Sequence, residues 1–250
     1  MNLGHFITET EFVSHIDIEA YPNGQVLTIC GDVPPTGWIT TAILTSYCSS
    51  IGTVSYIGRT IKRIDGYAVG TVVDICGDSA PSGWVTTVVK TSYCASIGLT
   101  SFIGRTIKRI DSYPVGTVVD ICGDAAPTGW VTTVVKTSYC ASIGLTSFIG
   151  RTIKRIDSYP AGTAVDVCGD AAPTGWVTTV IKSSYCASLG LTSYIGRTIK
   201  KTDGYPTGTT LDICGDNPPT GWITTVVKTS YCATVGLTSY FGRTILKIAD

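Results

Sequence analysis

The stretch that decides the fold is residues 113–158, YPVGTVVDICGDAAPTGWVTTVVKTSYCASIGLTSFIGRTIKRIDS, because close copies of it fill most of the chain. Sequence recurring at one fixed period is the signature of repeat architectures. The period is 46 residues, and the copies follow an N-terminal segment, residues 1–20. We number the copies repeats 1 to 5, and their ranges are 21–66, 67–112, 113–158, 159–204 and 205–250.

The outermost repeats differ most from the consensus. Repeats 2 and 3 are nearly identical, whereas repeat 1 has Gln25, Thr28 and Leu44 where the middle repeats have Thr, Asp and Lys. Atypical ends are expected in a linear stack, whose end faces meet water. We therefore expect a stacked, solenoid-like linear array. A five-bladed propeller is the alternative, since 46 residues is also the size of a propeller blade.

Three segments of repeat 2 have the pattern of β-strands. Residues 71–76 alternate apolar and polar side chains, and residues 84–93 are rich in β-branched residues. Residues 102–110 form the third segment, in which Gly104 is expected to mark a bulge. Residues 77–83 have the composition of a turn, and no segment has a helical period. The predicted fold class is all-β.

The N-terminal segment is weakly similar to the end of a repeat. Residues 14–20 align with residues 60–66, so the chain carries an extra copy of the last strand of a repeat. This strand is expected to cap repeat 1 or to pair with another molecule. The segment has neither a basic nor an apolar signal region, and no apolar run of about 18 residues predicts membrane insertion.

Charge is scarce and balanced. The chain has 18 basic and 18 acidic residues, and its 14% charged content is well below the roughly 25% of an ordinary soluble domain. Without a strong positive field, we expect no binding to nucleic acid.

The ten cysteines recur as two per repeat, separated by 18 residues within a repeat and 28 between repeats. Paired recurrence without a CxxC motif predicts disulfides and an extracellular setting. Zinc ligation and buried free thiols are the alternatives. The candidate disulfide residues are Cys30, Cys48, Cys76, Cys94, Cys122, Cys140, Cys168, Cys186, Cys214 and Cys232.

Two pairings of these cysteines remain open. If the first two strands form a straight hairpin, Cys94 lies roughly 33 Å from Cys76 at about 3.3 Å per residue, which is too far for a disulfide. A bridge within the repeat therefore needs a bent second strand or a different strand arrangement. A Cys94–Cys122 bridge would join neighbouring repeats and leave Cys30 and Cys232 free. The pairing within each repeat is slightly favoured because it leaves no odd thiol.

Catalytic motifs are missing from the sequence. The two histidines, His5 and His15, lie outside the repeats, and no nucleophile elbow, P-loop, dinucleotide fingerprint or HExxH motif occurs. We expect no enzyme activity, no cofactor and no metal. Calcium binding at Asp78 is an alternative that no calcium-binding loop pattern supports.

Sugar binding is the functional alternative to a structural role. A flat aromatic ring can cover a pyranose face, and carboxylates and guanidinium groups bind its hydroxyls. Packing in the core is the other interpretation of the Trp residues. The candidate ligand-binding residues are Trp38, Trp84, Trp130, Trp176 and Trp222, Asp32, Asp78, Asp124, Asp170 and Asp216, and Arg59, Arg105, Arg151, Arg197 and Arg243.

The repeats resemble an uncharacterised tandem repeat of bacterial surface proteins. The similarity rests on Ile75-Cys76-Gly77, Pro81, Gly83-Trp84-Val85, Cys94 and Thr106-Ile107-Lys108-Arg109-Ile110, and on their equivalents in all five repeats. The resemblance implies a surface setting and assigns no activity.

The function expected from these features is that of a non-enzymatic extracellular structural protein. It would assemble with copies of itself into a fibre or surface layer through end-to-end β contacts. A multivalent carbohydrate-binding protein, a lectin or adhesin with one glycan site per repeat, is the alternative.

Overall fold

The computed structural model describes residues 21–31, 33–45, 47–50, 57–90, 94, 103–136, 140, 149–182, 186, 195–229, 232 and 241–249. The predicted extra strand in residues 1–20 therefore lies outside the described residues. The chain divides into two compact units, which are described separately. The first holds repeat 1 and most of repeat 2, and the second holds residues 86–89 with repeats 3 to 5.

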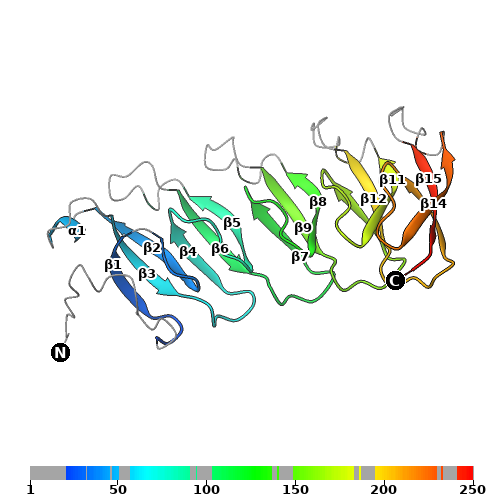
Figure 1. Ribbon diagram of the computed structural model, residues 1–250. Helices are drawn as coiled ribbons and strands as arrows, with labels where there is room; N and C mark the ends of the chain where they lie inside the picture. Colours follow the sequence, from blue (N-terminus) through cyan, green and yellow to red (C-terminus); the bar gives the residue numbers. More distant parts are fainter. Residues whose placement is uncertain are drawn as a thin grey trace. The chain divides into compact units, whose positions relative to one another are not determined.

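The described residues form five antiparallel sheets of three strands each, one from each repeat, as Figure 1 shows. In repeats 1 and 2 the strands are β1 (Val26–Cys30), β2 (Trp38–Leu44), β3 (Gly58–Arg63), β4 (Val72–Cys76), β5 (Trp84–Lys90) and β6 (Gly104–Arg109). In repeats 3 to 5 they are β7 (Val118–Cys122), β8 (Trp130–Lys136), β9 (Gly150–Arg155), β10 (Ala164–Cys168), β11 (Trp176–Lys182), β12 (Gly196–Lys201), β13 (Thr210–Cys214), β14 (Trp222–Lys228) and β15 (Gly242–Lys247). One helical turn, α1 (Tyr47–Ser50), follows β2. The all-β prediction is confirmed.

The third strand of each repeat lies in the middle of its sheet. In repeat 2, β6 lies between β4 and β5, and Cys76 of β4 pairs with Gly104 of β6. In repeats 1, 3, 4 and 5 both outer strands pair antiparallel with the central strand, so the outer strands run parallel to each other. The first and second strands do not pair with each other, so they do not form a straight hairpin.

A bulge occurs on the second strand of the repeat and not on the third. In repeat 1 the register shifts between Thr40 and Ala42, so Thr41 is the extra residue. Its hydroxyl donates to the carbonyl of Thr60 on the central strand, at 3.2 Å. Repeats 3, 4 and 5 have the same shift. The bulge predicted at Gly104 is wrong, since this glycine is the first residue of β6.

The glycine that opens the central strand is required by a close approach of backbone. At Gly58, the equivalent of Gly104, a Cβ atom would lie 2.6 Å from the carbonyl oxygen of Leu44. No side chain fits at that distance, so the residue must be glycine for the strands to begin in register.

The second strand begins with a tight turn. The amide of Trp84 donates to the carbonyl of Pro81 at 3.0 Å, and Gly83 between them has a φ of 80°. A positive φ at the third position of a turn is nearly free for glycine and costly for other residues. The Pro-x-Gly-Trp motif thereby directs each Trp side chain into the core.

Apolar cores form between consecutive repeats inside each unit. In the first unit, Ile39 and Ile64 of repeat 1 pack with Ile75, Trp84 and Ile107 of repeat 2. In the second unit, the same positions of repeats 3 and 4 form an equivalent cluster, and those of repeats 4 and 5 form another. Stacking therefore supplies the core that a 46-residue repeat is too small to form alone. A linear stack of all five repeats stays a prediction, as does the propeller alternative.

No helix within the described ranges is both long enough and apolar enough to cross a membrane.

Candidate functional site

All ten cysteines form disulfides within their own repeats. The pairs are Cys30–Cys48, Cys76–Cys94, Cys122–Cys140, Cys168–Cys186 and Cys214–Cys232, with Cα separations of 5.5–5.7 Å. The favoured pairing within each repeat is confirmed, and the pairing between repeats is wrong, so Cys30 and Cys232 are not free thiols. Five disulfides in one chain indicate a non-reducing environment.

Strand order explains how the two cysteines of a repeat meet. The first and second strands run in the same direction and lie on either side of the third strand. Cys76 ends β4, and Cys94 follows the end of β5, so both residues lie at the same end of the sheet. The 33 Å separation calculated for a hairpin therefore does not arise.

Three of the disulfides also contact the repeat before their own. In the first unit, Ile43 of repeat 1 packs against Cys76 and Cys94 of repeat 2. In the second unit, Val135 packs against the Cys168–Cys186 pair, and Ile181 against the Cys214–Cys232 pair. The disulfides are thus part of the junction between repeats.

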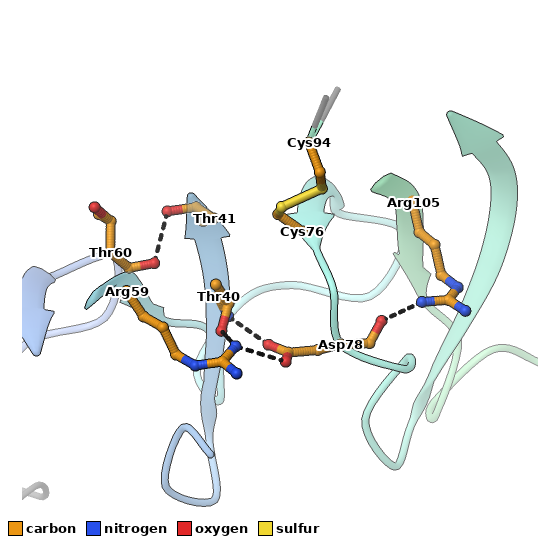
Figure 2. The surroundings of a disulfide bond; sticks show 8 residues. All are labelled: Thr40, Thr41, Arg59, Thr60, Cys76, Asp78, Cys94 and Arg105. Atoms are coloured by element: carbon orange, nitrogen blue, oxygen red, sulfur yellow. Dashed lines mark hydrogen bonds and ion pairs between the residues drawn. A yellow bond between two sulfur atoms is a disulfide. The ribbon is translucent and has the colours of Figure 1, made fainter. Parts of the chain in front are cut away.

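A conspicuous polar feature of the junction is an aspartate that crosses from one repeat to the preceding one. The Asp78 carboxylate of repeat 2 accepts the backbone N–H of Thr40 in repeat 1 at 2.8 Å, and Figure 2 shows this contact. Arg59 of repeat 1 lies 3.5 Å from the other carboxylate oxygen and also donates to the Thr40 hydroxyl at 3.3 Å. One carboxylate therefore binds both a backbone donor and a cation of its neighbour.

The same contact recurs in the second unit. The amide of Thr132 donates to Asp170 at 2.6 Å, and the amide of Thr178 donates to Asp216. In all three cases the donor lies on the outer second strand of the sheet, and the acceptor follows the first strand of the next repeat, 38 residues later. The junction is thus one interaction repeated with the period of the sequence.

This contact satisfies a group that is otherwise costly to bury. An outer strand presents backbone N–H groups on the side away from its sheet. Thr40, Thr132 and Thr178 are completely buried, and a buried N–H without an acceptor costs about 1–3 kcal/mol. A carboxylate is a strong acceptor for such a group. The aspartate thus lets an outer strand be covered without a further strand.

The candidate arginine side chains donate hydrogen bonds to the backbone carbonyl oxygens of the same aspartates. Arg105 donates to the carbonyl oxygen of Asp78 at 2.5 Å, as Figure 2 shows. Arg151, Arg197 and Arg243 donate in the same way to Asp124, Asp170 and Asp216, at 2.7, 2.9 and 2.5 Å. The structure therefore brings the predicted Asp and Arg residues together, but in contacts that build the repeat. Asp32 lies outside the described residues.

The five Trp side chains do not belong to this cluster. Each is only 5–7% exposed and lies in the core, with an edge-to-face contact to the Tyr that begins its repeat. A ring this deeply buried has no free face to cover a sugar. The ligand-contact role considered for Trp38, Trp84, Trp130, Trp176 and Trp222 is therefore not supported, and these residues contribute to packing.

A second polar cluster crosses each sheet of repeats 2 to 5. In repeat 2, Lys90 of β5 reaches over the central strand to Asp74 of β4 at 2.7 Å, and the Thr106 hydroxyl donates to the same carboxylate at 2.6 Å. Burial disfavours the charged form of Asp74, but the hydrogen bonds from Lys90 and Thr106 outweigh it and lower the pKa of Asp74. Repeat 1 has Thr28 and Leu44 at the Asp and Lys positions, so it lacks this pair.

The pKa values of the equivalent aspartates are also lowered. For Asp120 and Asp166, burial opposes ionisation, and hydrogen bonds from the lysine and threonine partners outweigh it. For Asp212, the hydrogen bond from Lys228 is the largest cause. The four pairs stabilise the sheets in which they lie.

Among the described residues, no group of three or more His, Cys, Asp or Glu side chains is arranged to hold a metal ion. The two histidines of the chain, His5 and His15, lie outside the described residues.

Comparison of the chain with protein-family models, curated proteins and solved structures finds no match. The resemblance to repeats of bacterial surface proteins therefore rests on the quoted motif alone.

Sequence reasoning missed the role of the threonine in the second strand. Thr40 and its equivalents look like ordinary strand residues, and their contribution to the junction comes from the backbone N–H, which no side-chain motif reveals. The signal available was the recurrence of the Thr and the Asp with a constant 38-residue separation.

The disulfide pairing can be checked in repeat 5, whose tryptic peptides differ from those of the other repeats. Trypsin releases residues 202–228 with Cys214 and residues 229–243 with Cys232. Mass spectrometry without reduction is expected to find the two peptides linked, and reduction should separate them. Recovery of residues 229–243 with a free thiol would contradict the pairing.

Loss of the crossing carboxylate should weaken a junction. Asp78→Ala leaves the buried N–H of Thr40 without its acceptor, so the free energy of unfolding should fall by about 1–3 kcal/mol. The control is Asp111→Ala, which removes a surface ion pair with Arg109 and should cost at most about 1 kcal/mol. Urea unfolding of the full chain measures both, and equal losses would contradict the role given to Asp78.

Acid should weaken the pairs that cross the sheets. Because the folded pKa of Asp74 is lowered, its contribution is present above the unfolded value of about 3.8 and is lost as the pH falls through the folded pKa. A double variant that copies repeat 1, Asp74→Thr with Lys90→Leu, should lose less stability than the parent between pH 5 and pH 2.

The reciprocal control introduces the pair into repeat 1. Thr28→Asp with Leu44→Lys should make the loss of stability in acid steeper, and urea unfolding at several pH values measures both variants. Identical pH dependence in the parent and both variants would show that the pairs do not contribute.

Proposed function

We propose that this chain is a non-catalytic structural protein that works outside the cell and associates with copies of itself into a fibre or surface layer. The supporting evidence comes from the disulfides, from the exposed face of repeat 5 and from the charge balance.

The observation that carries the proposal is an apolar face of repeat 5. Ile223, Val227 and Ile248 are 44%, 61% and 50% exposed, and Thr224 is also exposed. In repeats 1, 3 and 4 the residues at these four positions are at most 3% exposed, because the next repeat covers them. The equivalent residues of repeats 1, 3 and 4 bind the next repeat, so this face is suited to bind another repeat of the same kind. We call residues Ile223, Thr224, Val227 and Ile248 the end face.

Two further properties support an assembly outside the cell. Five disulfides persist where thiols are not kept reduced, as they are in extracellular and surface proteins. The formal net charge of zero means that copies of the chain do not repel one another through a net charge. Both properties suit a protein that packs closely with itself.

The geometry gives less support to the carbohydrate-binding alternative. A glycan site built on the predicted Trp, Asp and Arg residues would need the Trp rings at the surface, and all five are buried. The described Asp and Arg side chains of that set already take part in contacts within and between repeats. A lectin site would therefore have to use other residues.

Self-association is tested on the purified, oxidised full chain. Sedimentation velocity is expected to show a mass that grows with protein concentration, and electron microscopy should show unbranched filaments or sheets. A monomer at every concentration would contradict the proposal. A glycan array probed with the same sample serves as the comparison, since specific binding by a monomer would favour the carbohydrate-binding alternative.

A further inference from the structure

The chain enters and leaves each repeat at the same end of its sheet. In repeat 3 the first strand, β7, pairs antiparallel with the central strand, β9, and Val118 lies opposite Lys154. The pairing continues outward to Arg155, whose amide donates to the carbonyl of Thr117 and whose carbonyl accepts the amide of Gly116, both at 2.9 Å. Tension between the start and the end of the repeat therefore pulls directly on this outermost pair of hydrogen bonds.

Such tension opens the sheet one pair of residues at a time. When the bonds of Arg155 break, the load passes to the next pair and so along β9 to Gly150, which lies opposite Cys122. The second strand, β8, pairs with the other edge of β9, and its first residue, Trp130, lies opposite Arg155. The central strand thus separates from both neighbours starting at one end. The hydrogen bonds break in succession and not together, so the sheet opens by unzipping.

The disulfide limits how far an opened repeat extends. Cys122 ends β7, and its bridge to Cys140 bypasses an 18-residue stretch that contains β8. Tension therefore follows 28 residues of each 46-residue period. At about 3.5 Å per residue, this path is about 100 Å long when extended, whereas a repeat without its disulfide would reach about 160 Å.

The strand that forms the junction with the next repeat lies off this path. The amide of Thr132 in β8 donates to Asp170 of repeat 4 at 2.6 Å, and Val135 in β8 packs against the Cys168–Cys186 disulfide. Both residues belong to the loop that the Cys122–Cys140 bridge closes. Tension on the opened repeat therefore does not pull directly on the strand that binds its neighbour.

Arg155 is the residue at which opening begins. Its guanidinium donates to the carbonyl of Tyr113, the first residue of the repeat, and to the Asp157 carboxylate at 2.8–3.1 Å. This side chain thus joins the start of the repeat to its end, at the point where tension acts. Arg63 and Arg109 make the same contact with the first Tyr of repeats 1 and 2.

Repeat 4 has a lysine at this position. The amine of Lys201 donates to Asp203 at 2.8 Å. A lysine lacks the planar fork with which an arginine holds a carboxylate and a second acceptor in fixed directions. Repeat 4 is therefore held less firmly at this end than repeat 3.

We infer that each repeat is an extensible element, which opens under tension from the end held by Arg155 or its equivalent and stops extending at its disulfide. This property goes beyond the proposed function, because it belongs to a single chain and does not depend on association between copies. A chain of such repeats yields to tension in steps, one repeat at a time. The second strand of each repeat stays outside the path of the load.

Stretching the oxidised full chain by its two ends in an optical trap tests this inference. We expect a separate opening step for each repeat. A small-molecule thiol should leave folded repeats unchanged, since Cys122 and Cys140 are each 2% exposed, and should lengthen each opened repeat by about a further 60 Å. Opening of all repeats in a single event would contradict the inference. So would opening steps in the presence of thiol that have the longer length from the start, because the disulfides would then be reduced in folded repeats.

Arg155→Lys, which copies repeat 4, tests where opening begins. At constant force, one opening step should become about tenfold faster, because a charged hydrogen-bonding group is weakened. The matched control is Arg151→Lys, the same change near the other end of β9, where Arg151 donates to the carbonyl of Asp124 at 2.7 Å. This control should leave the opening rates unchanged. Equal effects of the two variants would mean that the load is shared along the strand, and unzipping from Arg155 would be wrong.

The reciprocal variant is Lys201→Arg, which gives repeat 4 the residue of repeat 3. It should slow one opening step by about the same factor. Circular dichroism of all three variants establishes that the unstretched chains are folded, so that a change in opening rate reports the response to tension. Unchanged rates in both Arg155→Lys and Lys201→Arg would show that this position does not hold the repeat closed.

Discussion

The fold depends on one interaction, the hydrogen bond from a backbone N–H on an outer strand to an aspartate of the following repeat. A repeat of 46 residues has too little core to be stable alone, so its faces and its edge must be covered. In the first unit the covering element is repeat 2, and Asp78 satisfies the Thr40 amide that repeat 2 buries. Because the acceptor is a side chain and not another strand, consecutive sheets pack together and remain separate sheets. The outer strand is covered although no further strand pairs with it, and this also limits unwanted strand pairing.

The disulfides and the strand order act together with this interaction. Placing the third strand in the middle makes the two outer strands parallel and brings both cysteines to one end of the sheet. The bridge joins the end of the first strand to the segment after the second, and it gives the preceding repeat a rigid apolar surface, against which Ile43 packs. The disulfides of repeats 2, 4 and 5 thus stabilise their own repeats and also form part of the junction with the preceding repeat.

Much of this arrangement follows from the sequence, and what does not follow has a physical reason. The repeat period, the three strands of each repeat, the all-β class and the favoured cysteine pairing were predicted correctly. The order of the strands was not, because alternation of apolar residues reports which face of a strand is buried and not which strand lies beside it. The Trp residues could not be assigned from their type, since an aromatic ring suits a core and a sugar site equally well. The role of Thr40 could not be predicted from its side chain, because its backbone N–H forms the contact with Asp78.

The constant 38-residue separation between donor and acceptor has a consequence for how such a chain changes length. Any segment of 46 residues in the repeat region contains one threonine at the donor position and one aspartate at the acceptor position, wherever the segment starts. A duplication or deletion of one whole period therefore leaves every remaining threonine with an aspartate 38 residues ahead, except in the final repeat. The near identity of repeats 2 and 3 is what a recent event of this kind leaves behind. Genetic recombination can thus lengthen or shorten the protein in whole-repeat steps without a new interface having to evolve.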